Sequence, residues 1–123
     1  MAYLTDRKRA EGLGSAKSGT KHFWKMIGSS IALQVMIPLF VFTFGIGLGG
    51  TFEEVQAYFS RPLPVIIMAA SLIVLISHFT AEAVEAVEDY MHGMAEKLTL
   101  LGLNALAYTL IAVGLFALAR MAL

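Results

Sequence analysis

The stretch that decides the fold reads LPVIIMAASLIVLISHFTAEAVEAVEDY over residues 63–90. Its apolar part, Leu63–Val87, exceeds the ~20 residues that a helix needs to cross the hydrocarbon of a bilayer. Two further apolar stretches, Phe23–Gly49 and Leu98–Met121, lie before and after it. In lipid only a helix or a closed barrel satisfies its backbone polar groups, and the sequence lacks the short alternating strands of a barrel. The sequence therefore predicts an all-α integral membrane protein whose three transmembrane helices form a single domain, residues 1–123.

Composition agrees with lipid as the solvent of this chain. Hydrophobic residues make up 58% of its 123 residues, whereas a soluble domain has roughly 45–50%. Nine acidic and nine basic residues balance, so the net charge indicates neither nucleic acid nor an acidic substrate as a partner. Because the chain has no cysteine, it cannot itself hold a disulfide, an iron–sulfur cluster or a thiolate metal site.

Lysine and arginine residues are distributed unevenly between the two ends of the predicted spans. Most lie before or at the start of the first span or between the second and third: Arg7, Lys8, Arg9, Lys17, Lys21, Lys25 and Lys97. Only Arg61 and Arg120 fall at the opposite ends. The positive-inside rule therefore predicts a cytoplasmic arm over residues 1–22 and a cytoplasmic loop over residues 90–97, with residues 50–62 and the C-terminus outside.

The segment between the first two spans carries signals for a short helix lying on the membrane surface. Thr51 and Glu54 have the spacing of a capping box. Phe52, Val55 and Phe59 fall on one face of that helix. Prolines at 62 and 64 are expected to begin the second span, because proline is tolerated in the first turn of a helix.

Two other motifs are interpreted as packing features. The run Gly45–Gly50 has the spacing of a nucleotide-binding glycine motif, but it ends a transmembrane helix and does not join a strand to a helix. Close helix packing and a helix C-cap explain its glycines better. Asn104, Tyr108 and Thr109 lie among small residues of the third span, where we expect packing and interhelical hydrogen bonds.

A stripe of ionisable residues runs along the second span. His78, Glu82, Glu85 and Asp89 are spaced by four, three and four residues, which places them on one side of a helix. Ionisable groups inside a span cost about 2.5 kcal/mol or more each and normally face a bundle interior, a partner or a cavity. This stripe is therefore expected to face protein and not lipid.

Two residues of this span are candidates for chemistry. His78 lies near the middle of the bilayer, where its imidazole is either a metal ligand or a hydrogen-bonded structural group. Tyr90 follows about 18 Å further along the helix, at the cytoplasmic edge. Its phenol is either an ordinary interfacial tyrosine or a hydrogen-bond donor to a quinone carbonyl. The neighbouring Asp89 likewise has two interpretations: it is either part of such a quinone site or simply a polar residue at the membrane interface.

The arrangement His78-x10-Asp89-Tyr90 on the second of three spans resembles the small hydrophobic membrane anchor of succinate dehydrogenase, respiratory complex II. The resemblance extends over nearly the whole chain and includes SGTKHFW at residues 18–24, where the first span begins. The segments YLTDRKR at residues 3–9 and LGSAKSG at residues 13–19 resemble the alphaproteobacterial branch of that family.

The resemblance implies specific roles, cofactors and partners. His78 would be one axial ligand of a haem b shared with the partner anchor subunit, with His22 and Lys25 near the haem propionates. Tyr90 and Asp89 would bind ubiquinone at the cytoplasmic face. The flavoprotein and iron–sulfur subunits would dock there and oxidise succinate, so the chain would be a non-catalytic, multi-pass subunit in the bacterial inner membrane. It would thereby serve the respiratory chain and the tricarboxylic acid cycle.

The chain departs from the family pattern at three positions. Many members have glycine and glutamine where this chain has Glu82 and Glu85, and an arginine is common where Ile27 stands. Carboxylates near haem propionates would repel them unless they are protonated or paired with cations such as Lys21, Lys25 or residues of a partner.

Two other functions remain open from the sequence. A haem-free, purely structural anchor for a soluble dehydrogenase would use the basic N-terminal arm and the same spans. A small proton-coupled transporter would use His78, Glu82 and Glu85 as a relay, although no second polar span completes a pathway.

Overall fold

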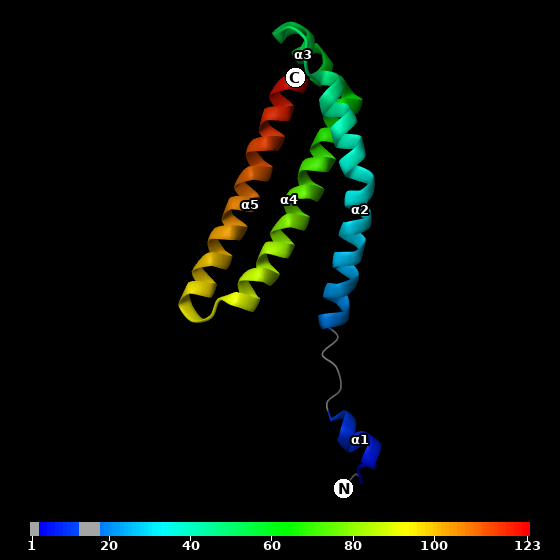
Figure 1. The fold of residues 1–123 in the computed structure, drawn as a ribbon, viewed down its shortest axis with the longest axis vertical. Helices are drawn as coiled ribbons and strands as arrows, with labels where there is room; N and C mark the ends of the chain where they lie inside the picture. The colour runs from blue at the N-terminus through cyan, green and yellow to red at the C-terminus, as the bar shows by residue number, and fades with distance from the viewer. Residues whose placement is uncertain (1–2, 13–17) are drawn as a thin grey trace.

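A computed structural model describes residues 3–12 and 18–123 of the chain (Figure 1). Its elements are α1 (Asp6–Glu11), α2 (Ser18–Gly47), α3 (Phe52–Phe59), α4 (Pro62–Tyr90) and α5 (Gly93–Ala122). Every regular element in the described ranges is a helix, which confirms the all-α prediction. Of the segment over residues 13–19 that resembles the alphaproteobacterial anchors, residues 13–17 lie outside the described part.

Three of these helices, α2, α4 and α5, are long and apolar enough to cross a membrane. In Figure 1 the beginning of α2 and the α4–α5 turn lie at one end of the bundle, and α3 and the C-terminus lie at the other. Helix α4 packs against both α2 and α5, whereas α2 and α5 make no contact with each other in the described part of the chain. The bundle is therefore an open three-helix arrangement with α4 in its centre.

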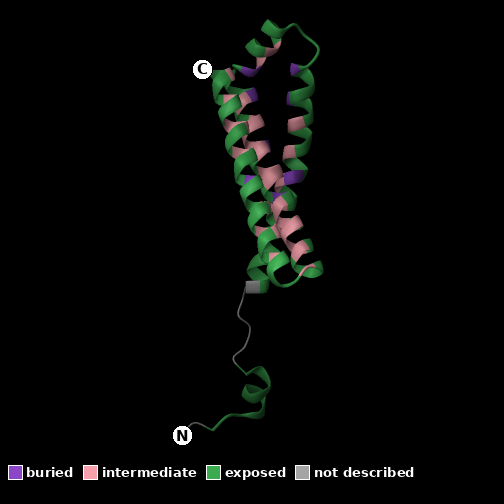
Figure 2. Cartoon of the chain, turned by 90° about the vertical axis from the view of Figure 1, so that its left-hand side faces the viewer, coloured by how far each residue is buried: buried purple, intermediate pink, exposed green. Residues whose placement is uncertain are grey.

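Many large apolar side chains are exposed, and Figure 2, which colours the chain by burial, shows exposed residues along all the long helices. The few buried residues of the described part include the polar or ionisable Thr43, Ser71 and His78 as well as Leu33, Phe59 and Ala107. A soluble protein would have the opposite distribution. Since lipid is as apolar as leucine, close packing and hydrogen bonds between helices hold such a bundle together.

The interface between α2 and α4 follows a seven-residue repeat. On α4 the buried residues Pro64, Ser71 and His78 are seven apart, and Glu85 continues the series. His22 and Ser29 on α2 have the same spacing, and they contact Glu85 and His78, respectively. A seven-residue period keeps one face of each helix in contact along its length, and the pairing of residue 22 with 85 and of 29 with 78 shows that the two helices run antiparallel.

Residues at each end of α4 determine where the helix begins and where it ends. Pro62 occupies its first turn, where a missing backbone N–H breaks no helical bond. At the other end, Met91 and His92 are extended and Gly93 has a φ of 70°. The helix thus ends at Tyr90, three residues beyond the apolar stretch Leu63–Val87, and a two-residue connection turns the chain back into α5.

Helix α3 closes the end of the bundle opposite the α4–α5 turn. The predicted capping box is present, with Thr51 and Glu54 bonding each other's backbone N–H. The hydroxyl of Tyr58 donates to the carbonyl oxygen of Thr43 at 2.8 Å, and Phe59 is buried. A Cβ at Gly47 would lie 2.6 Å from Cζ of Phe59, so α3 approaches α2 as closely as only glycine permits. The expectation of close packing is confirmed at Gly47, whereas nothing lies within 4 Å of a Cβ added at Gly45 or Gly49.

Replacing Gly47 by alanine should therefore destabilise the bundle by about 1–3 kcal/mol, because the aromatic rings of α3 must move to admit the methyl group. Gly45→Ala is the matched control, since nothing lies within 4 Å of its added Cβ. Thermal unfolding of the detergent-solubilised protein complex would compare the two variants. Equal midpoints for both would contradict the tight α2–α3 contact.

Candidate functional site

His78 lies midway along α4 on the face that packs against α2, and only 5% of its surface is exposed. Its Nδ1 is 2.9 Å from Oγ of Ser29. The Ser29 hydroxyl donates its hydrogen to the carbonyl oxygen of Met26 at 3.0 Å. The Ser29 hydroxyl therefore lies within hydrogen-bond distance of both Nδ1 of His78 and the backbone of its own helix. This contact with the neighbouring helix fixes the orientation of the ring.

The second nitrogen of His78 contacts the carboxylate one turn further along α4. Nε2 lies 2.9 Å from Oε1 of Glu82, whose side chain is 52% exposed. The two atoms thus lie within the distance of a histidine–carboxylate ion pair. Both ring nitrogens thus have partners within this chain: Ser29 lies on the neighbouring helix, and Glu82 is a half-exposed residue of α4 itself.

A second histidine–carboxylate pair joins α2 to α4 nearer the α4–α5 turn. Nε2 of His22 contacts Oε1 of Glu85, and both side chains are about half exposed. Each of the two carboxylates that depart from the family pattern therefore contacts a histidine: Glu82 contacts one on its own helix and Glu85 one on α2. Histidines, rather than the lysines considered from sequence, are their partners in this chain.

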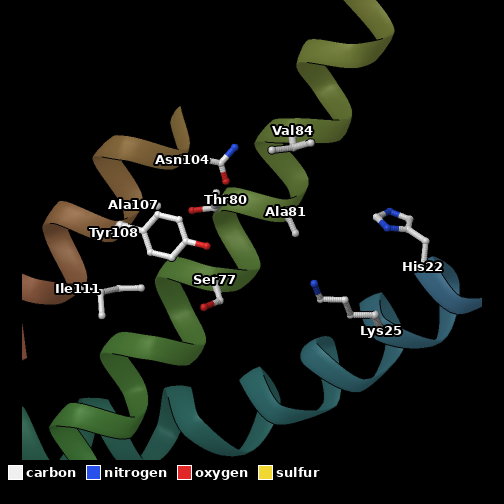
Figure 3. A pocket seen from close by; sticks show the side chains of 10 residues that line it. All are labelled: His22, Lys25, Ser77, Thr80, Ala81, Val84, Asn104, Ala107, Tyr108 and Ile111. Atoms are coloured by element: carbon white, nitrogen blue, oxygen red, sulfur yellow. The ribbon is translucent and has the colours of Figure 1, made fainter. Parts of the chain in front are cut away.

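A cavity of about 310 Å³ lies beside this seam and is lined by α2, α4 and α5 (Figure 3). Its polar lining consists of His22, Lys25, Ser77, Thr80, Asn104 and Tyr108. The structure thus brings together His22 and Lys25, two of the three residues expected near a haem. His78, the third, is not part of this lining and stays in the α2–α4 seam.

Sequence reasoning missed the role of α5 in this cavity. Asn104 and Tyr108 were expected to make interhelical hydrogen bonds, together with Thr109. Instead, the Asn104 amide donates to the carbonyl oxygen of Leu100 at 2.9 Å, and the Thr109 hydroxyl donates to that of Ala105 at 2.7 Å. A signal for this cavity is present in the sequence. Polar residues recur at helical spacing in both spans, at positions 77 and 80 of α4 and at positions 104 and 108 of α5, which indicates that the two helices turn polar surfaces toward each other.

Asp89 and Tyr90 form the last turn of α4, beyond the histidine–carboxylate pairs. Both are exposed, and Tyr90 retains 86% of its accessible surface. Thus the structure separates Tyr90 from His78 by twelve residues of helix, about 18 Å. Neither residue of this last turn lines the cavity beside the seam. Their side chains lie at the end of the bundle, available to a molecule or a protein that approaches from there.

The donor set of this chain fits a metal site that is completed by another protein. Among the described residues, no group of three histidine, cysteine or carboxylate side chains is placed to hold a metal ion. A haem iron needs only one axial nitrogen from each of two chains, and buried His78 offers one with its other nitrogen fixed by Ser29. The residues present therefore fit a shared haem better than a metal held by this chain alone.

Comparisons with known proteins agree with the resemblance seen in the sequence. A family model described as succinate dehydrogenase/fumarate reductase transmembrane subunit matches residues 1–119. The chain is 41% identical over 123 residues to the succinate dehydrogenase hydrophobic membrane anchor subunit of Paracoccus denitrificans. That alignment covers 100% of this chain and 95% of the relative. No solved structure matches the chain.

Ser29→Ala should destabilise the bundle by about 1–3 kcal/mol, because it leaves Nδ1 of a buried imidazole without its hydrogen-bond partner. Ser30→Ala is a matched control, since the Ser30 hydroxyl also donates to the Met26 carbonyl but lies on an exposed position. Unfolding of the solubilised complex would measure both effects. A loss of stability as large in Ser30→Ala as in Ser29→Ala would contradict the role assigned to the Ser29–His78 bond.

Proposed function

Because the chain belongs to the succinate dehydrogenase/fumarate reductase transmembrane subunit family, we propose that it supplies one haem b ligand and part of a ubiquinone site. It is a multi-pass membrane anchor and not itself a catalytic subunit. The observation that carries the proposal is the burial of His78 in the middle of α4 with its Nδ1 held by Ser29. In this role the chain couples succinate oxidation to quinone reduction in the bacterial inner membrane.

The proposed orientation places the beginning of α2 and the α4–α5 turn in the cytoplasm. These two segments lie at the same end of the bundle, and they carry most of the lysines and arginines. Asp89 and Tyr90 belong to that end as well. The proposed quinone residues therefore face the side on which soluble subunits of the complex would dock.

His78 is the proposed axial ligand, and a histidine of the partner anchor subunit would provide the other. When bound, a b-type haem supplies one-electron redox chemistry within the membrane. His22 lies seven residues before Ser29 on the same face of α2, about 10 Å nearer the cytoplasmic end. Lys25 extends into the cavity that His22 also lines (Figure 3). A lysine and a histidine at this level are suited to bind the carboxylates of haem propionates.

Tyr90 and Asp89 are the proposed quinone-binding residues of this chain. A phenol donates a hydrogen bond to a quinone carbonyl, and Asp89 precedes it in the same exposed helical turn. Because 86% of the Tyr90 surface is exposed, this chain alone does not enclose a quinone at that residue. The site therefore requires walls from the partner anchor subunit and from the iron–sulfur subunit, which receives electrons from the flavoprotein subunit.

A haem-free structural anchor is the second candidate. One observation favours it: both nitrogens of His78 already have partners within the chain. In that case the imidazole serves as a hydrogen-bonded link between α2 and α4, and only Tyr90 and Asp89 take part in quinone reduction.

A reduced-minus-oxidised absorption spectrum of the purified complex distinguishes these candidates. We expect a b-type signal in the wild type and its loss in His78→Ala. A signal that persists in His78→Ala would move the ligand to another residue. A wild-type spectrum without haem would favour the structural anchor.

Tyr90→Phe should lower kcat/KM for quinone reduction by roughly tenfold, the value of one lost hydrogen bond at about 1.4 kcal/mol. Succinate oxidation with a soluble artificial electron acceptor should not change, because that reaction bypasses the quinone. Tyr108→Phe is the control, since it removes an exposed phenol on α5. Equal quinone kinetics in the wild type and Tyr90→Phe would exclude Tyr90 from the site.

A further inference from the structure

We propose that Glu82 occupies the ligand nitrogen of His78 until haem is inserted, so that haem binding is an exchange between the iron and this carboxylate. The inference rests on the proposed role of His78 as a haem ligand. It assigns Glu82 as a positioning residue that keeps the imidazole oriented in the haem-free protein and weakens haem binding by competing for Nε2.

The first step is that only one nitrogen of His78 is available to iron. Nδ1 lies 2.9 Å from the Ser29 hydroxyl on the neighbouring helix. Iron binds an imidazole nitrogen through its lone pair, so Nδ1 is not available to iron as long as it keeps this contact. Nε2 is therefore the ligand atom, and it is also the atom that contacts Glu82 at 2.9 Å.

The second step is that Glu82, unlike Ser29, can leave. Ser29 belongs to another helix and is anchored by its bond to Met26. Glu82 is four residues from His78 on the same helix, with 52% of its side chain exposed. Rotation about its own side-chain bonds withdraws the carboxylate without any movement of the backbone, and a hydrogen held at Nε2 leaves with that carboxylate. The arrangement thus has one fixed partner that sets the direction of the ring and one that can be displaced.

The third step separates Glu82 from its neighbour Glu85. Both place a carboxylate next to a histidine in the same seam, but Glu85 contacts His22 on α2. General repulsion between acidic residues and haem propionates would act through both carboxylates. Competition for the ligand nitrogen acts through Glu82 alone. Comparing Glu82→Ala with Glu85→Ala therefore distinguishes this competition from charge repulsion.

The test uses the intact membrane complex purified from haem-depleted cells and titrated with ferric haem, with the absorption band of the ligated haem as the readout. Glu82→Ala should bind haem at least about fivefold more tightly than the wild type, corresponding to about 1 kcal/mol for the lost contact. Glu82→Gln, which keeps the size of the side chain, should fall between them. Glu85→Ala is the matched comparison: it releases His22 and leaves the contact at Nε2 of His78 in place, so it should raise the affinity for haem less than Glu82→Ala does.

A double substitution connects the effect to the ligand. His78→Ala should lose the band of the ligated haem, and adding Glu82→Ala should not restore it, because Glu82 acts only through the nitrogen of His78. An equal gain of affinity in Glu82→Ala and Glu85→Ala would overturn the inference in favour of charge repulsion. An unchanged affinity in Glu82→Ala would overturn it outright, while ligation by His78 in the wild type would still support the proposed function.

An independent measurement requires no haem. In the haem-free complex with ¹⁵N-labelled histidine, Glu82→Ala should shift the Nε2 resonance of His78, and Glu85→Ala should shift that of His22 instead. A His78 resonance that does not respond to Glu82→Ala would overturn the inference. If the wild type shows this contact but His78→Ala binds haem normally, the proposed function fails, and the competition for a ligand nitrogen fails with it.

Discussion

The imidazole of His78 must have both nitrogens satisfied in a bundle surrounded by lipid, and the α2–α4 interface depends on this constraint. Lipid offers no hydrogen bonds, so an unpaired ring nitrogen would be strongly unfavourable. Ser29 supplies one partner across the interface and Glu82 the other along the helix. The same seven-residue repeat that pairs Ser29 with His78 also pairs His22 with Glu85. The polar contacts therefore fix the register of two otherwise apolar helices.

Much of the fold follows from patterns that depend on the bilayer. The three spans, the capping box at Thr51 and the close packing at Gly47 were predicted because length, cap spacing and small residues have direct physical meaning. The orientation of the bundle stays a prediction from its charges. The neighbours of each span were not predictable, because every face of an apolar helix is equally suited to lipid. The partners of Asn104 and Thr109 were mispredicted for this reason: each bonds its own helix.

At the candidate site, too, the sequence pattern predicted which residues face protein but not which residues they contact. The stripe from His78 to Asp89 was predicted to face protein, and His78, Glu82 and Glu85 do make contacts within the chain. The sequence did not indicate that Glu82 and Glu85 would contact histidines and not the lysines of the first span. Nor did it indicate a cavity that includes Ser77 and Thr80. Such contacts depend on which helices meet and in what rotation, and a single sequence does not specify either.

In the described part of the chain α2 and α5 do not contact each other: long α4 packs against both, and short α3 contacts both at one end of the bundle. A substitution on an outer face of α5 has to satisfy only lipid, whereas one on α4 encounters a neighbour on either of two sides. During evolution the central helix α4 should therefore tolerate the fewest amino-acid substitutions, and α5 the most. A library of random variants selected for assembly would record this as a gradient of permissiveness that decreases toward the middle of the bundle.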